Sequence, residues 1–159
     1  MSNDLNDRND RNDLNDLGEV TITRIYEAPR DLVFECMTTP EHLTHFWGPP
    51  GMSTPLDDIV LELRVGGRFE TVMVNDATGE RYPNAGVFVE IDPPAKLAWR
   101  ETGFADGMVS TSTFTDLGND RTEVVIHQTG VPAMFRSPEA IAGFESSLDR
   151  FVAYLATIR

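Results

Sequence analysis

The chain has 159 residues, of which 26 are acidic and 13 are basic, so its formal net charge is −13 with neutral histidines. This length predicts one domain. The content of 40% hydrophobic and 25% charged residues indicates a globular protein, and it argues against collagen-like, coiled-coil and fully disordered chains. The acidic balance argues against nucleic acid as a partner, because duplex binding needs clustered basic side chains. It argues equally against docking on an anionic membrane.

The cysteine content and the hydropathy limit the chemistry and the location. A single cysteine, Cys36, forms no intramolecular disulfide and no multi-cysteine zinc site. No apolar run reaches the ~18 residues that a membrane span needs, and the polar N-terminus lacks the pattern of a secretory signal. We therefore expect a cytoplasmic protein with no metal and no other cofactor. Lys96 is the only lysine among the basic residues, a bias that suggests a GC-rich bacterial genome.

Residues 3–17 consist of consecutive triplets that each begin with Asn-Asp. Asn and Asp disfavour helix interiors, and a period of three gives no persistent apolar stripe on a helix. The leucines of this segment bury too little apolar surface to offset the entropy of ordering it. We expect a disordered tail over residues 1–18 and one domain over residues 19–159. Calcium binding by the aspartates is the alternative, but the repeat lacks the glycine turn and terminal glutamate of a known calcium loop.

The domain begins with a β-rich run over residues 19–27, which predicts a strand. Pro29 then marks the start of a first short helix, whose apolar residues recur at helical spacing. Thr39 and Pro40 form an N-cap and first-turn pair, so a second short helix follows. It ends before residues 46–50, where a Gly-Pro-Pro sequence requires a loop.

A β pattern interrupted by turn residues fills the middle of the chain. The connections contain the Gly, Pro, Asn and Asp residues typical of tight turns. Such short connections predict an antiparallel meander. The expected strands cover residues 53–63, 68–74, 80–91, 96–102, 108–116 and 121–129.

The last element is a long amphipathic helix, with Ser137 as N-cap and Pro138 in the first turn. Strands grouped together, with helices at the two ends, predict an α+β fold. A helix of about 20 residues is ~30 Å long, which is about the width of six or seven strands. We therefore expect this helix to lie across a curved antiparallel sheet of six to seven strands, with two short helices after the first strand. Its apolar stripe consists of Phe144, Leu148, Phe151 and Leu155.

Five segments of the chain read APRDLVF from Ala28, TPEHL with FWGP from Thr39, ELRVGGRF from Glu62, GVFVEIDPPAKL from Gly86, and SLDRF from Ser147. In series they resemble the sequence pattern of the activator-of-heat-shock-protein-90-ATPase homologue-like family, which belongs to the START-like, helix-grip (SRPBCC) superfamily. The resemblance extends over residues 19–158. Phe46 and Phe144 stand where the family usually has Trp.

The resemblance implies a helix-grip fold with an apolar cavity between the sheet and the C-terminal helix. It leaves several functions open, because proteins with one fold can have different functions. We expect binding of a small apolar molecule, lipid-like or polycyclic. The alternatives are a protein-interaction or co-chaperone-like module, with a role in stress response, and a cyclase- or hydrolase-type enzyme that uses a polar cavity residue. The chain carries no catalytic motif that we recognise, which favours a binding protein.

We interpret the candidate ionisable residues as structural and not catalytic. His42 and His45 lack the third ligand that a metal site needs nearby, and His127 stands alone on a strand. We interpret these histidines as structural or solvent-facing. Glu90 and Glu101 have strand positions that could point inward, and we expect them to be paired with Arg64, Arg68 or Arg100.

The expected cavity wall combines aromatic, aliphatic and threonine side chains from the strands and the last helix. Pockets of this kind are lined by apolar groups with few polar ones. The alternative interpretation is that the same side chains only fill a core. The candidate ligand-binding residues are Trp47, Phe69, Thr71, Met73, Phe88, Leu97, Trp99, Met108, Thr113, Phe144 and Leu148.

Overall fold

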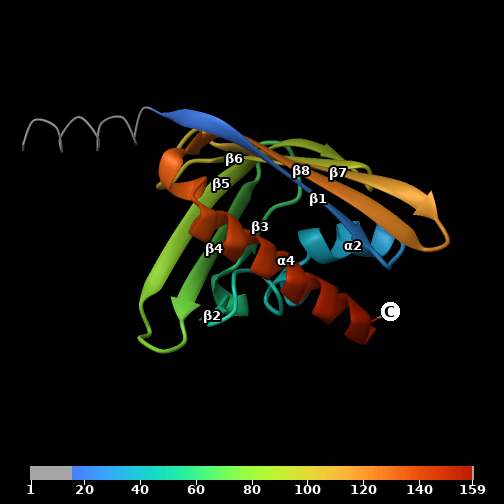
Figure 1. The fold of residues 1–159 in the computed structure, drawn as a ribbon, viewed down its shortest axis with the longest axis horizontal. Helices are drawn as coiled ribbons and strands as arrows, with labels where there is room; N and C mark the ends of the chain where they lie inside the picture. The colour runs from blue at the N-terminus through green and yellow to red at the C-terminus, as the bar shows by residue number, and fades with distance from the viewer. Residues whose placement is uncertain (1–15, 159) are drawn as a thin grey trace, which may run out of the picture.

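The computed structural model describes residues 16–158. The predicted disordered tail over residues 1–18 therefore lies almost entirely outside the described residues. The described part contains one antiparallel sheet and a long C-terminal helix, which confirms the α+β prediction (Figure 1). None of its helices is long and apolar enough to cross a lipid bilayer.

The sheet contains eight strands, and every pairing between them is antiparallel. The first strand joins the C-terminal end of the meander by pairing with the last strand. In order along the sheet the strands are β1 (Leu17–Tyr26), β8 (Arg121–Pro132), β7 (Val109–Gly118), β6 (Lys96–Glu101), β5 (Arg81–Asp92), β4 (Arg68–Asn75) and β2 (Met52–Ser53), with β3 (Val60–Leu61) beside β4.

The segment expected to form one strand over residues 53–63 is broken into three elements. β2 and β3 are two residues each, and the 3-10 helix η1 (Leu56–Asp58) lies between them. Pro55 precedes η1 with a φ of −61°. Because proline has no backbone N–H to donate to a sheet, it interrupts the strand at this point. The break adds one strand to the expected number.

β1 starts at Leu17, two residues before the expected boundary, because Arg136 holds the preceding chain in place. The guanidinium of Arg136 donates from Nη2 to the carbonyl of Asp16 at 2.8 Å and forms an ion pair with its carboxylate at 3.0 Å. Nε of Arg136 donates to the Val131 carbonyl at 3.1 Å. One side chain thus ties the start of β1 to the end of β8, and β1 includes Leu17 and Gly18.

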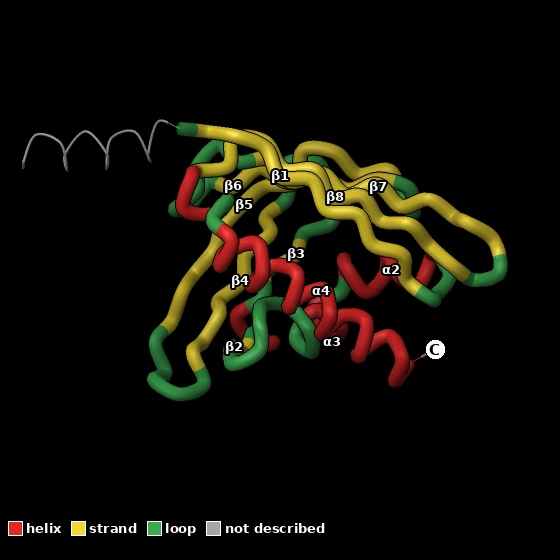
Figure 2. Tube along the Cα trace, viewed as in Figure 1, coloured by secondary structure: helices red, strands yellow, loops and turns green. Residues whose placement is uncertain are grey.

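The helices agree with their predicted positions, since α2 (Arg30–Thr38) and α3 (Pro40–Leu43) follow β1 and α4 (Pro138–Ile158) ends the described chain. The 3-10 helix η2 (Ala133–Phe135) leads into α4. Oγ of Ser137 accepts from the Ala140 N–H at 3.1 Å, as expected for an N-cap. Figures 1 and 2 show the sheet curving around α4, with β4 and β5 beside one end of the helix and α2 beside the other.

The core forms where the apolar stripe of α4 meets the inner face of the sheet and the short helices. Phe151, 1% exposed, is in the middle of this stripe. Its ring centroid lies 4.9 Å from that of Tyr26 on β1 and 4.3 Å from that of Phe46, just after α3. Phe151 therefore joins three elements that are distant in sequence.

Replacing Phe151 with alanine should destabilise the protein by ~3–5 kcal/mol, the usual cost of truncating a buried aromatic side chain. Denaturant unfolding followed by circular dichroism measures this change as a lower midpoint. Val152→Ala is the control, because Val152 is the next residue of α4 and is 45% exposed. A Phe151→Ala midpoint equal to that of the wild type would contradict the central role of this contact.

Candidate functional site

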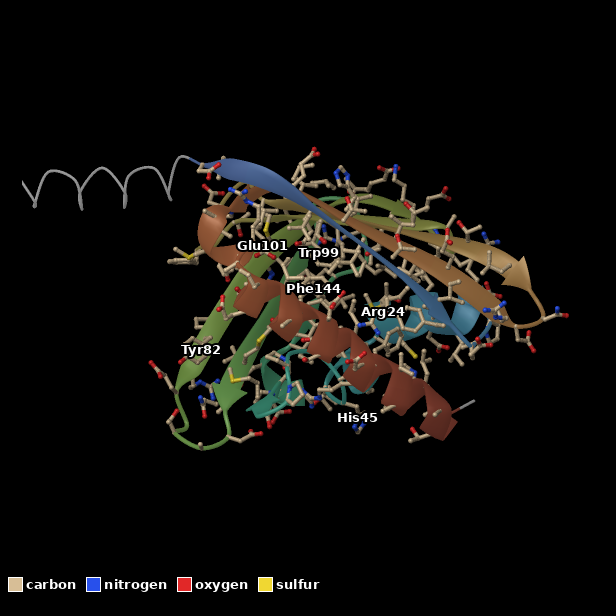
Figure 3. The ribbon with its side chains drawn as sticks, in the orientation of Figure 1. Arg24, His45, Tyr82, Trp99, Glu101 and Phe144 are labelled. Atoms are coloured by element: carbon tan, nitrogen blue, oxygen red, sulfur yellow. The ribbon has the colours of Figure 1, made fainter. Side chains whose placement is uncertain are left out.

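A cavity of about 160 Å³ lies between α4 and the inner face of the sheet, and one side of it is open to solvent. Its wall is mostly apolar and combines side chains from α2, the loop after α3, the strands β4 and β6 to β8, and α4. Figure 3 shows Trp99 and Glu101 close together near Phe144 of α4. Five of the predicted cavity residues line it, namely Trp47, Met73, Trp99, Phe144 and Leu148.

Other predicted residues are buried but do not line the cavity. Thr71 is 2% exposed and Leu97 is 1% exposed, and neither is a lining residue of the cavity. The ring of Phe69 contacts those of Phe88 at 5.5 Å, Trp47 at 5.5 Å and Trp99 at 5.2 Å. Phe69 and Phe88 therefore support the two cavity tryptophans from behind, as the core interpretation expected.

The prediction for β7 is wrong at Thr113, which is exposed on the outer face of the sheet. Met108 precedes the strand, is half-buried and does not line the cavity. Successive strand residues point to opposite faces, so Met108 and Thr113, five positions apart, could not share one wall. The inward positions of β7 are Ser110 and Ser112, which are almost fully buried and line the cavity.

These two serines explain why space remains under α4. Leu97 and Trp99 pair with them on β6, while Ile126 and Gln128 pair with them on β8. Small side chains thus lie between larger ones in the middle of the inner face. Ser147 lines the cavity from the helix side. Sequence reasoning missed these serines because it searched mainly for large apolar side chains, whereas the cavity volume depends on small side chains.

The loop that carries Trp47 is fixed by Arg150 of α4. Nη1 of Arg150 donates to the carbonyls of Gly48 at 2.8 Å, Pro49 at 3.1 Å and Met52 at 3.2 Å. The hydroxyl of Thr54 donates to the Trp47 carbonyl at 2.7 Å. These bonds hold the Trp47 ring 6.1 Å from the ring of Trp99, so both tryptophans of the chain line the same cavity.

Glu101 is the ionisable residue of the cavity wall among residues 16–158. Its Oε1 accepts a hydrogen bond from Nε1 of Trp99 at 3.1 Å. Burial raises the pKa of the Glu101 carboxyl, and the Trp99 hydrogen bond opposes this shift because it stabilises the charged form. No arginine partner is found for Glu101 among the described residues, so the expected Glu–Arg pair is wrong here.

Glu90 lies on the outer face, where its carboxylate is 3.2 Å from Nζ of Lys96. The inward orientation expected for Glu90 is therefore also wrong. The β-bulge between Phe88 and Glu90 changes the alternation of β5 at this point. The three candidate arginines pair elsewhere: Arg64 and Arg68 with Glu62, and Arg100 with Asp106.

The histidines and the cysteine have structural surroundings. Nδ1 of His42 lies 2.5 Å from the hydroxyl oxygen of Tyr154, and the ring of His45 stacks on that of Tyr154 at 5.0 Å. His127 is half-buried, and its Nε2 lies 3.6 Å from a carboxylate oxygen of Glu19. Burial raises the pKa of the Cys36 thiol to about 11, which leaves it protonated and unreactive at neutral pH. Within residues 16–158 no group of side chains is arranged to hold a metal ion.

Replacing Glu101 with glutamine should stabilise the protein at about pH 7 and leave its stability nearly unchanged at about pH 4. The raised pKa means that the folded state favours protonated Glu101. Its contribution to folding stability is therefore fully present below the ordinary glutamate pKa of 4.5 and is lost as the pH rises through the raised pKa. Glutamine keeps the oxygen that accepts from Trp99 and does not titrate. Urea unfolding at both pH values measures the difference.

Glu90→Gln is the matched control, because it removes the same charge from the outer face, where Lys96 is its partner. A Glu101→Gln gain that is equally large at both pH values, or absent at neutral pH, would contradict the burial of this carboxyl.

Solved structures share this architecture. Protein CV1439 from Chromobacterium violaceum is 22% identical, with a TM-score of 0.75 over 86% of this chain and 96% of that one. Protein Ms6760 from Mycobacterium smegmatis is 25% identical, with a TM-score of 0.75 over 89% and 92%. The AHSA1 protein from Silicibacter pomeroyi is 22% identical, with a TM-score of 0.73 over 89% of this chain and its full length.

A comparison with curated protein sequences finds no match. The family model described as "Activator of Hsp90 ATPase homolog 1-like protein" matches residues 27–156, which is most of the chain. The matched region includes the short helices, every strand from β2 to β8 and nearly all of α4. The chain therefore belongs to the family of Activator of Hsp90 ATPase homolog 1-like proteins.

Proposed function

We propose that the protein binds a compact apolar molecule in the cavity between α4 and the sheet. The observation that carries this function is the cavity itself, which two tryptophans, Met73 and Phe144 line with mostly apolar surface. Ligand sites are typically concave and apolar with a few placed polar groups. Family membership supports the same function, because START-like domains commonly hold apolar ligands between the sheet and the last helix.

The cavity volume limits the size of the ligand. About 160 Å³ is close to the ~150 Å³ of an engineered apolar cavity that holds benzene, and it is below the ~300 Å³ of small drug-sized pockets. One ring or a short alkyl chain therefore fits inside. A lipid-like or polycyclic ligand binds only with part of its length outside the opening.

The enzyme alternative needs two ionisable side chains that converge in the cavity. Among residues 16–158 the only ionisable side chain of the wall is that of Glu101, so no acid–base pair is assembled there.

The protein-interaction alternative has a specific observation in its favour. Phe104 is 76% exposed and its ring lies 6.1 Å from that of Phe135, beside the exposed Met134. Exposed apolar clusters of this kind are typical of protein-contact surfaces. If no apolar ligand binds the cavity, protein interaction becomes the better-supported function.

Replacing Ser147 with leucine should weaken binding of toluene and hexanol at least tenfold, because the larger side chain fills the cavity from α4. Ser147 lines the cavity, whereas its neighbour Ser146 does not, so Ser146→Leu is the matched control. Tryptophan emission measures binding, because both tryptophans of the chain line the cavity. Thr113→Trp should leave binding unchanged, since this side chain lies on the outer face.

Wild-type binding should be saturable, with dissociation constants below ~1 mM, or about −4 kcal/mol. Absence of saturable binding by either compound would refute the proposed function. Equal binding by the Ser147→Leu and Ser146→Leu variants would place the ligand outside this cavity.

A further inference from the structure

Two polar atoms of the cavity wall have no hydrogen-bond partner within residues 16–158. Oε1 of Glu101 accepts from Trp99, but its second carboxylate oxygen accepts from no described group. Oγ of Ser112 is fully buried and also unpaired. The neighbouring Ser110 differs, because its Oγ lies 3.5 Å from Nε2 of Gln128. An unpaired buried polar group costs free energy, so the Ser112 hydroxyl calls for a partner that the described chain does not supply. The second oxygen of the half-buried Glu101 is free to accept a hydrogen bond from a ligand in the cavity.

The cavity wall has no positive charge to receive an anion. Its described lining residues contain no lysine, arginine or histidine. Arg150 is the nearby cation, and its Nη1 already donates to three loop carbonyls. A carboxylate ligand would therefore meet the carboxyl of Glu101 with no compensating charge, and like charges in a poorly solvated site repel strongly.

We propose that Glu101 determines the specificity of the cavity: it accepts a hydrogen bond from the hydroxyl of a compact apolar ligand and excludes carboxylates of the same shape. Because such a ligand must first enter the cavity, this inference rests on the proposed function. The ligand class is an uncharged alcohol or phenol with a short apolar body. Glu101 is well placed for this role, since it ends β6 beside Trp99 and faces the cavity near Phe144 (Figure 3).

The uncharged hydroxyl fits better than a charged ammonium. Most of the wall is apolar, and a cation loses its hydration there at a high free-energy cost. A hydroxyl loses much less hydration and still donates one hydrogen bond. It also accepts one, so the unpaired Ser112 hydroxyl offers a second partner to a ligand seated deeper on the sheet.

The test compares three probes with the same six-carbon chain: hexanol, hexanoate and hexylammonium. Tryptophan emission at neutral pH and physiological salt gives each dissociation constant, and salt at this level screens surface charges beyond ~8 Å. The wild-type protein should bind hexanol at least tenfold more tightly than hexanoate or hexylammonium. Glu101→Gln keeps an acceptor oxygen and removes the charge, so it should bring hexanol and hexanoate within about threefold of each other.

Glu90→Gln is the matched control, because it also removes one negative charge, but on the outer face, and it should keep the wild-type preference. Equal wild-type affinity for hexanol and hexanoate would overturn the inference and leave the proposed function intact. Tighter binding of hexylammonium would overturn the choice of an uncharged ligand. Absence of binding by all three probes, together with toluene, would overturn both. If the Glu101→Gln variant fails to fold, equal wild-type affinity for hexanol and hexanoate still overturns the inference.

Discussion

The contact between α4 and the inner face of the sheet is the constraint on which the rest of the structure depends. A sheet curved around one helix has one apolar face to cover, and α4 covers it with Leu148, Phe151 and Leu155. Phe151 reaches both Tyr26 on β1 and Phe46 after α3, so the first strand, the short helices and the last helix have a common centre. Because these segments are distant in sequence, the inner face, and with it the cavity, is complete only when α4 is in place.

The cavity arises where that contact is incomplete. Side chains in protein interiors normally fill space to crystal-like density. Here Ser147 on α4 lies over a part of the sheet where β7 contributes Ser110 and Ser112. Small side chains therefore face the cavity from both the helix and the sheet. The same helix closes the side of the site through Arg150, which holds the loop that carries Trp47. The α4 helix thus stabilises the fold through Phe151 and leaves cavity space beside Ser147. Through Arg150 it also positions the loop that carries Trp47.

Local patterns predicted the elements well, and long-range contacts limited the prediction of the site. Period and turn residues located the helices and most strands, and the α4 stripe indicated its buried face. The face of β7 could not be assigned in the same way, because Thr113 and the true wall residue Ser112 are both small and neutral. Pro55 was a visible signal that a single strand over residues 53–63 was too long. The hydrogen bonds of Arg150 join residues about one hundred positions apart, and no local pattern reveals them.

The polar atoms in the wall favour the proposed binding site over an imperfectly packed core. A core is most stable with apolar side chains, and one buried unpaired hydroxyl costs ~1–3 kcal/mol. Ser112 carries such a hydroxyl, and Glu101 keeps a carboxyl whose burial disfavours its charged form. Valine or leucine at Ser112 and glutamine at Glu101 would remove both costs without changing the strands. Residues that break local rules of stability are typical of functional sites, where a ligand supplies the missing partner. Glu101 and Ser112 both line one cavity, beside the two tryptophans. A purely structural core does not explain why these two polar side chains lie together.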